Sequence, residues 1–291
     1  MRVAVSGSHG LIGGRLLAEM RKAGHEVTVL QRAPGPVQPD ARSAGAFADI
    51  DAVVHLAGSP IAAGRWTARR KREILDSRAA GTRRLVEALA GGGARPRVFI
   101  SASAVGYYGP CGDEALDEQS PPGRDFLAGV CVAWEDAALG AAQALRARVV
   151  HLRTGVVLSA EGGMLARLMP FFRLGLGGPV GSGRQWLPWI SLDDEARAIM
   201  ALLQREDAAG AYNLCAPAPV RSAEFAHALG RVLRRPAALP LPSAAVRLMF
   251  GEMGEAVLLA GQRALPRRLE DSGFTFRQGE IDAALRHCLQ V

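Results

Sequence analysis

Short apolar runs alternate with longer segments of helical periodicity through the first two thirds of the chain. In the segment 11–23, apolar residues recur three and four positions apart, and Gly24 follows as a natural helix end. The same criteria predict strands at 2–6, 26–30, 51–56, 97–101 and 149–152, and helices at 11–23, 67–89 and 126–145. This alternation indicates an α/β fold, a Rossmann-type doubly wound parallel sheet with right-handed crossovers.

The pattern changes after Leu158, where glycine-rich stretches surround one apolar helix. We expect the segment 159–190 to form a smaller substrate lobe. A Leu-Pro-Leu-Pro linker at 239–242 then precedes a mainly helical C-terminal appendage. The predicted units are a cofactor-binding domain, 1–238, and a small C-terminal domain, 239–291.

Composition narrows the class of protein. Apolar residues make up 49% and charged residues 22% of the chain, as in ordinary globular proteins. No apolar run is long enough to span a membrane, and the N-terminal residues predict a strand rather than a signal peptide, so we expect a cytoplasmic protein without a membrane partner. The four cysteines stand far apart, which predicts reduced structural thiols and no metal site.

The charge balance is basic, with a net charge of +7 and a pI near 9.9. The excess is mostly arginine, spread over several predicted helices, and no nucleic-acid motif accompanies it. Solvated helix faces and attraction to an anionic cofactor account for it. We therefore expect a small-molecule substrate and no nucleic-acid partner, while the sequence does not specify the oligomeric state.

A glycine-rich turn joins the first predicted strand to the first predicted helix. It reads Gly7-Ser-His-Gly-Leu-Ile-Gly13. Glycines keep such a turn tight and let the backbone approach a pyrophosphate, while the N–H groups at the helix N-terminus attract its charge. We therefore predict a dinucleotide cofactor. The residues of this turn that we expect to bind it are Gly7, His9, Gly10, Leu11 and Ile12.

The end of the second predicted strand distinguishes between the two nicotinamide cofactors. NAD-binding proteins usually place Asp or Glu there to hold the ribose hydroxyls. This chain has Gln31 and Arg32. Because a guanidinium suits the additional phosphate of NADP, these residues predict NADP(H). The alternative is that Arg32 is a solvated loop residue.

With the glycine turn, three other stretches make the chain resemble the extended short-chain dehydrogenase/reductase family; they lie at 55–58, 99–109 and 189–194. The chain is most similar to the sugar-nucleotide-epimerase-like branch with a small additional C-terminal domain. That similarity lies at 125–128, 134–135, 153–158, 173–183, 261–266 and 273–274. The resemblance implies the Rossmann-type fold, NADP(H), and an oxidoreductase or epimerase activity whose substrate it does not specify.

The resemblance also implies positions for cofactor contacts. Leu56, Ala57 and Gly58 would line the adenosine side with backbone atoms. Val157 would lie near the nicotinamide. On the long helix, Glu73 and Arg78 would face the cofactor and the reaction cleft, unless they form an ordinary surface pair. His55 lies within a predicted strand, which favours packing over acid–base chemistry.

The usual catalytic pair of this family is absent. Its members carry Tyr-x-x-x-Lys, in which the tyrosine exchanges a proton with the substrate oxygen and the lysine lowers the tyrosine pKa. Alignment on Glu135 places Leu127 and Cys131 at these two positions, and a shift by one residue places Phe126 and Val130 there. Neither register supplies a phenol or an amine.

Other polar groups must then manage the proton. Ser103, or else Ser101, matches the hydroxyl residue that precedes the pair in the family. Tyr107 and Tyr108 follow it closely, although they can also simply pack against their loop. The predicted catalytic residues are Ser103, Tyr107, Tyr108 and Arg78, and further polar candidates are Glu73 and Glu118.

A second polar segment, 175–189, contains Arg184, Gln185, Trp186 and Trp189 among flexible glycines. In the family the matching segment closes over the substrate, and these side chains suit a polar, phosphorylated or sugar-like ligand. The alternative is that both tryptophans pack against the C-terminal appendage.

Two functions fit these features. The first is an NADP-dependent oxidoreductase or epimerase that acts on a small polar or nucleotide-linked substrate. The second is an NADPH-binding regulator or sensor without turnover, which the absent Tyr-Lys pair favours.

Overall fold

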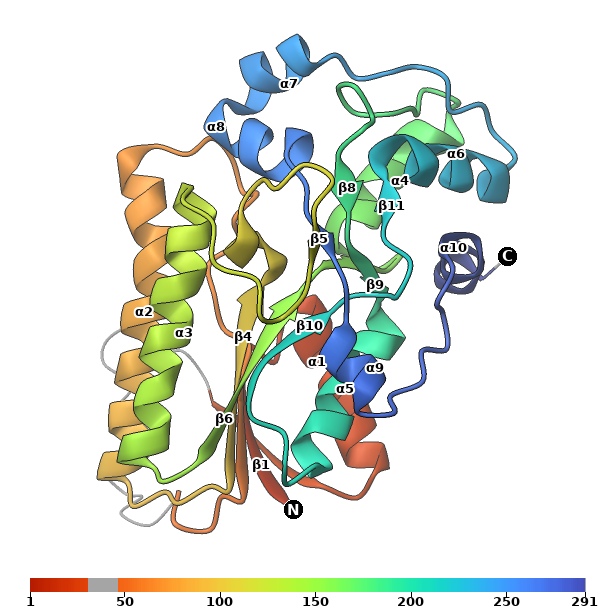
Figure 1. Cartoon of the computed structure of the whole chain (residues 1–291). Helices are drawn as coiled ribbons and strands as arrows, with labels where there is room; N and C mark the ends of the chain where they lie inside the picture. Colours follow the sequence, from red (N-terminus) through yellow and green to blue (C-terminus); the bar gives the residue numbers. More distant parts are fainter. Residues whose placement is uncertain (31–46, 291) are drawn as a thin grey trace.

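A computed structural model describes residues 1–30 and 47–290. A six-stranded parallel sheet lies at its centre, in the order β10-β6-β4-β3-β1-β2 (Figure 1). Its strands are β1 (Arg2–Ser6), β2 (Glu26–Leu30), β3 (Ala52–His55), β4 (Val98–Ala104), β6 (Arg148–Thr154) and β10 (Gly210–Leu214). The predicted doubly wound fold is confirmed.

Helices cover both faces of this sheet (Figure 1). Along β1 the buried side chains alternate, so that Val3 and Val5 join the core on one face and Ala4 joins the core on the other. Burial on both faces explains why the strands are continuous apolar runs. The covering helices are α1 (Leu11–Lys22) and α5 (Leu192–Gln204) on one face, and α2 (Ala68–Gly91) and α3 (Phe126–Ala144) on the other.

Smaller elements lie beyond the carboxyl ends of the strands. Leu165 and Phe172 of the expected lobe share one core with Leu229 and Leu285, which come from later helices. The lobe segment is therefore packed together with the C-terminal helix. The elements of this region are β7 (Val156–Leu158), α4 (Gly163–Arg173), β8 (Trp186–Leu187), β9 (Trp189–Ser191), β11 (Val220–Arg221), α6 (Ser222–Leu233) and α10 (Ile281–Leu289).

The C-terminal region is mainly helical, as predicted. It also contacts the main body: β12 pairs in parallel with β5, and Leu269 packs into the core beside α5. Met253 packs beside Trp66. The elements here are β5 (Ala115–Leu116), α7 (Ser243–Phe250), α8 (Glu252–Gly254), the π-helical turn η2 (Glu255–Leu259), β12 (Arg263–Ala264) and α9 (Arg267–Asp271).

The neighbouring strands β4 and β6 extend further than their apolar runs predict. Small residues continue β4 to Ala104, which pairs with Thr154 at the end of β6. One residue earlier, Ser103 pairs with Arg153. Paired residues of neighbouring strands point to the same face, so Ser103 and Thr154 point to opposite faces. The hydrophobic pattern also did not predict β10, since Gly210–Leu214 mixes glycine, tyrosine and asparagine.

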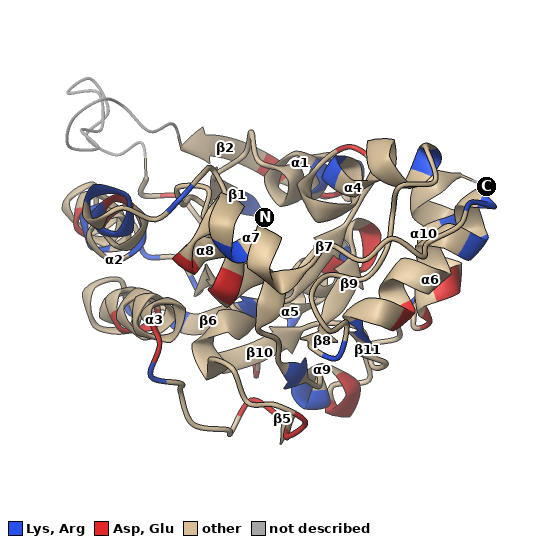
Figure 2. Ribbon diagram, turned by 90° about the horizontal axis from the view of Figure 1, so that it is seen from above, with Lys and Arg blue, Asp and Glu red and all other residues tan. Residues whose placement is uncertain are grey.

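The described residues also bear on the expectations about membrane helices, cysteines, metal ligands and charge. No helix in the two described stretches is long and apolar enough to cross a membrane. All four cysteines are free thiols. Residues 1–30 and 47–290 contain no group of three or more side chains placed to hold a metal ion. Viewed from above, basic residues are spread over several helices with acidic residues between them (Figure 2).

Candidate functional site

The glycine-rich turn connects β1 to α1 and has little space for side chains. Gly7 has a φ of +77°, and a Cβ there would lie 2.7 Å from the carbonyl carbon of Leu56. A Cβ on Gly13 would lie 2.2 Å from the carbonyl oxygen of Gly7. Gly10 is the N-cap of α1, and among the described residues no capping side chain bonds the N–H groups of the first turn. A diphosphate fits this place, because open N–H groups and the helix dipole attract it.

A cleft of about 510 Å³ begins at this turn and follows the carboxyl ends of β4 and β6. It starts where the sheet reverses its order, between β1 and β3, and open α/β sheets bind ligands at such a switch point. Trp186, Ala256 and Val257 bound its other end. The predicted cofactor residues that line the cleft are Gly7, Gly10, Leu11, Ile12, Leu56, Arg78 and Val157.

The other predicted cofactor residues lie around this cleft or outside the described residues. Ala57 follows Leu56 beside the glycine turn, and Gly58 lies against the Arg78 guanidinium. His9 is exposed, and its Nδ1 lies 3.3 Å from the Ser8 hydroxyl. The remaining two, Gln31 and Arg32, lie outside the described residues, so both assignments stay predictions.

Of the two polar residues that were predicted to face the cleft from α2, Arg78 lines it and Glu73 does not. Arg78 lines the cleft, donates from Nη1 to the carbonyl of Ser59 at 3.0 Å, and covers the Trp134 ring at 4.9 Å. Burial lowers its pKa from the ordinary arginine value. Glu73 does not contribute to the cleft lining; its carboxylate accepts from Arg70 and Arg69, whose hydrogen bonds lower its pKa. Glu73 thus pairs with Arg69 and Arg70 on the surface, and not with Arg78, the partner that the alternative interpretation gave it.

Ser103 lines the cleft from β4 and belongs to a buried ionic network. Its hydroxyl donates to Glu135 Oε1 at 2.7 Å. Arg153 donates to both oxygens of the same carboxylate, at 2.9 and 3.0 Å. The three side chains are buried. Because Arg153 bonds both carboxyl oxygens of Glu135, this side chain is fixed in place and can orient the Ser103 hydroxyl.

Two predicted catalytic tyrosines lie outside the cleft lining. Tyr108 donates its phenol to Asn213 at 2.7 Å and accepts from Arg153 at 3.1 Å. Burial raises its pKa well above the ordinary value. The Tyr107 ring stacks on the same guanidinium, with 3.4 Å between its centroid and the central carbon. Both tyrosines therefore pack around Arg153, which was the alternative to catalysis. Glu118 is also occupied, since it accepts from the backbone of Asn213 and Arg268.

The helix α3 presents an apolar surface where the family has its Tyr-Lys pair. Leu127, Val130 and Cys131 all line the cleft. Burial raises the pKa of the Cys131 thiol to about 12, so the thiol stays neutral at physiological pH. Either alignment register therefore leaves this wall without an acid or a base.

A second hydroxyl lines the cleft on the opposite face of the sheet. Thr154, at the end of β6, donates to Glu195 Oε1 at 2.9 Å. Glu195 is fully buried in the first turn of α5, and burial raises its pKa to about 8. Sequence reasoning missed this pair because Glu195 follows Asp193 and Asp194, which are typical of a helix N-terminus. The available signal was spacing: Glu195 shares the apolar face of α5.

The remaining sequence expectations divide between core and cleft. His55 is buried between the hydroxyls of Ser6 and Thr82, at 2.5 and 2.9 Å, and burial lowers its pKa to about 4. Trp189 is fully buried and donates to a backbone carbonyl. Trp186 instead lines the cleft and donates to Asp113 at 2.8 Å.

Neither polar neighbour of Trp186 is a cleft-lining residue. The Gln185 amide donates to the carbonyls of Val180 and Leu258, at 3.0 and 2.9 Å. Arg184 is exposed. The segment 175–189 therefore contributes an aromatic wall to the cleft.

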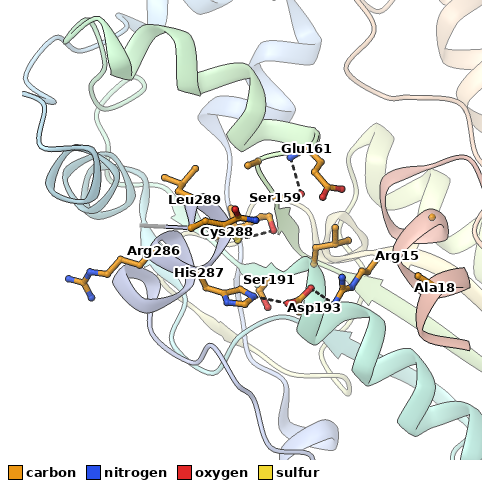
Figure 3. Close-up of a pocket in the computed structure, with 15 residues that line it drawn as sticks. Arg15, Ala18, Ser159, Glu161, Ser191, Asp193, Arg286, His287, Cys288 and Leu289 are labelled. Atoms are coloured by element: carbon orange, nitrogen blue, oxygen red, sulfur yellow. Dashed lines mark hydrogen bonds and ion pairs between the residues drawn. The ribbon is translucent and has the colours of Figure 1, made fainter. Parts of the chain in front are cut away.

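A larger cavity of about 1030 Å³ lies between α1 and α10 (Figure 3). Asp193 there pairs with Arg15 at 3.1 Å and with His287 at 2.6 Å, which ties α1, α5 and α10 together. The glycines of the phosphate turn do not line this cavity. Three of its polar side chains already pair with one another, and the phosphate turn lines the cleft instead, so we take the cleft as the candidate site.

Comparison with known proteins finds similar sequences and structures over nearly the whole chain. The model of the NAD dependent epimerase/dehydratase family matches residues 3–215, and a domain of unknown function, DUF1731, matches residues 241–288. An epimerase family protein of Mycobacterium tuberculosis is 47% identical over 291 residues, covering 97% of this chain and 96% of its own.

Two solved structures are similar over the whole chain. Human epimerase family protein SDR39U1 (isoform 2), solved with NADPH, has a TM-score of 0.91 at 37% identity, with 100% of this chain and 99% of that chain covered. A nucleoside-diphosphate sugar epimerase of Corynebacterium glutamicum has a TM-score of 0.78 at 35% identity. The match covers 99% of this chain and 58% of that longer chain.

Proposed function

The chain belongs to the NAD dependent epimerase/dehydratase family, and we propose that it is an NADP(H)-dependent oxidoreductase acting on a small carbonyl or hydroxyl compound. The observation that carries this proposal is one continuous cleft. It joins an open phosphate turn to two hydroxyls, those of Ser103 and Thr154, at the ends of neighbouring strands. This continuity supports a cofactor half and a polar reaction centre within one cavity.

The proposed cofactor follows from the phosphate turn and from the relatives. The N-terminus of α1 would hold the diphosphate, and Leu56 and Val157 would line the two ends of the dinucleotide. The NADPH in the human structure, with Arg32 in this sequence, supports NADP(H) over NAD(H). When bound, this cofactor supplies or accepts a hydride.

The residues of the reaction half would hold the substrate oxygen and exclude water. Glu135 accepts the Ser103 proton, so the Ser103 oxygen would accept a hydrogen bond from a substrate hydroxyl and orient it. Arg78 lines the cleft together with Val130 and Cys131, which the two alignment registers place at the lysine position of the family. The Arg78 guanidinium can therefore take over the lysine's positive charge. Apolar side chains of α3 and the C-terminal region form the other walls.

The same lining favours a small substrate over a nucleotide-linked one. A nucleoside diphosphate carries charges that proteins usually meet with several cations. Among the described residues, Arg78 is the one cation that lines the cleft. The alternative function, an NADPH sensor without turnover, is favoured by the apolar surface that α3 presents in place of the Tyr-Lys pair.

Cofactor titration tests the first half of the proposal. Native protein should bind NADPH more tightly than NADH, and Arg32→Ala should weaken NADPH by roughly ten- to a hundredfold while leaving NADH nearly unchanged. Nicotinamide fluorescence measures both affinities. Arg21→Ala, an exposed arginine at the far end of α1, is the matched control. Equal affinity of the native protein for the two cofactors would contradict the assignment.

Turnover distinguishes the enzyme from the sensor. The protein should oxidise NADPH in the presence of small carbonyl compounds, among which phenanthrenequinone is a broadly reactive probe. Tight NADPH binding without oxidation against a panel of carbonyl compounds and nucleotide sugars would favour the sensor.

A further inference from the structure

Glu195 is a buried acid that has no charged partner in residues 1–30 and 47–290. Its side chain is fully buried in the first turn of α5. Oε1 lies 2.9 Å from the Thr154 hydroxyl, and Oε2 has no hydrogen-bond partner among the described residues. Burial of a carboxylate without a cation is unfavourable, so the group is stable there as a neutral acid.

The groups around Glu195 leave its proton in place. The two acids before it bond to other groups. Asp193 pairs with Arg15 and His287. Asp194 accepts from Arg197 and from two backbone N–H groups. The titratable group near Glu195 directly after β10 is the Cys215 thiol, and burial raises the pKa of this thiol well above its ordinary value. In agreement, burial raises the pKa of Glu195 to about 8.

Thr154 connects this acid to the cleft. It is the last residue of β6 and lines the cleft together with Gly155 and Val157. A hydroxyl can rotate, so it can accept a proton from Glu195 while it donates its own into the cleft. The α3 wall offers no acid to the cleft, whereas this arrangement supplies a proton at the end of β6.

Resting on the proposed oxidoreductase function, we propose that Glu195 is the proton source for carbonyl reduction and acts through the Thr154 hydroxyl. In that step the substrate carbon gains a hydride from NADPH, and the carbonyl π electrons become a lone pair on its oxygen. The Thr154 O–H bond breaks as its proton bonds to this oxygen, and the Glu195 proton passes to Thr154 Oγ1. The Glu195 carboxylate regains a hydronium proton from solvent through the same Thr154 hydroxyl before the next turnover, which balances the one proton that each reduction consumes.

Three variants of the full-length protein test this role. Glu195→Gln keeps the shape and removes the acid, Thr154→Val removes the relay, and Thr154→Ser restores a hydroxyl. NADPH affinity is measured by fluorescence, reduction of phenanthrenequinone by NADPH absorbance across pH, and the protonated carboxyl by its infrared carbonyl stretch. The infrared measurement needs neither substrate nor turnover.

The proposal predicts an infrared band of a protonated carboxyl at neutral pH, which disappears as pH rises through about 8 and is missing in Glu195→Gln. Reduction should fall by about 10²–10⁴-fold in Glu195→Gln and Thr154→Val and recover in Thr154→Ser, with NADPH affinity unchanged in all three. The wild-type rate should decline above the same pH, and the decline should be absent in Glu195→Gln.

Each contrary result has its own meaning. An ionised Glu195 at pH below 7, or wild-type rates in both Glu195→Gln and Thr154→Val, would overturn the proton-source role alone. A protein that binds no NADPH, or binds it and reduces no carbonyl compound, would overturn the proposed function and this role with it. The infrared band would then identify Glu195 as a buried acid without catalytic consequence.

Discussion

Glu135 and Glu195 occupy similar places on opposite faces of the sheet and differ in one partner. Each lies on a helix packed against the sheet, and each bonds to a hydroxyl at the end of one of two neighbouring strands, Ser103 or Thr154. Arg153 holds both oxygens of Glu135. Glu195 has no cation beside it in the part of the chain that the structure describes.

This difference shows that the environment, and not the residue type, determines what a buried carboxyl can do. Arg153 and the Ser103 hydroxyl occupy the oxygens of Glu135, so this side chain can fix a hydroxyl. Without that cation, burial favours the neutral acid and Glu195 retains a proton to deliver. Paired carboxyl groups with opposed environments are how active sites divide such roles.

Removal of the charge on Glu135 should have the largest effect on stability. Glu135→Gln leaves the Arg153 guanidinium buried without its partner and should lower the free energy of unfolding by about 3–5 kcal/mol at neutral pH. Urea unfolding followed by circular dichroism measures this. Glu195→Gln is the matched control, and an equal loss in both variants would break the comparison.

The control variant should itself show a smaller effect of opposite sign. In the folded chain the pKa of Glu195 is raised from 4.5 to about 8. The protonated form therefore stabilises the fold fully below the unfolded pKa, and this contribution is lost as pH rises through about 8. As pH rises from 4.5 to about 8, the unfolding free energy of Glu195→Gln should increase relative to that of wild type by on the order of 1–3 kcal/mol. Unfolding midpoints measured on both sides of the window test this, and a constant difference would contradict it.

The tyrosines near Arg153 sharpen the comparison on the Glu135 side. Tyr108→Phe removes a donation to Asn213 and an acceptance from Arg153, so it should cost about 1–2 kcal/mol of unfolding free energy. NADPH affinity should not change, because Tyr108 is not part of the cleft lining. Tyr107→Phe keeps its ring on the guanidinium and should cost less. Weaker NADPH binding by Tyr108→Phe would show that the Tyr108 phenol contributes to the cofactor site.

The cofactor half of the cleft was predictable because its determinants are local. The turn from Gly7 to Gly13, the strand before it and the helix after it are contiguous, and β1 and β2 have the predicted bounds. Arg78 lines the cleft as the resemblance implied, because its position is determined by the single helix α2.

The reaction half depends on contacts between distant segments. Whether Tyr108 faces a substrate or Asn213, which is 105 residues away, depends on the arrival of β10, a strand that the pattern did not indicate. The pairing of Thr154 with Glu195 likewise joins the end of one strand to a later helix. Sequence spacing predicted the absence of a tyrosine-lysine pair on α3, but not the residues that surround the resulting gap.

A crystal structure of the NADPH complex tests the central claim most directly. The account predicts the diphosphate at the N-terminus of α1, with the reacting edge of the nicotinamide next to the hydroxyls of Ser103 and Thr154 and remote from both tyrosine phenols. A ligand placed beside this edge should reach both hydroxyls. A nicotinamide turned away from Thr154, or one in contact with the phenol of Tyr107 or Tyr108, would contradict the account.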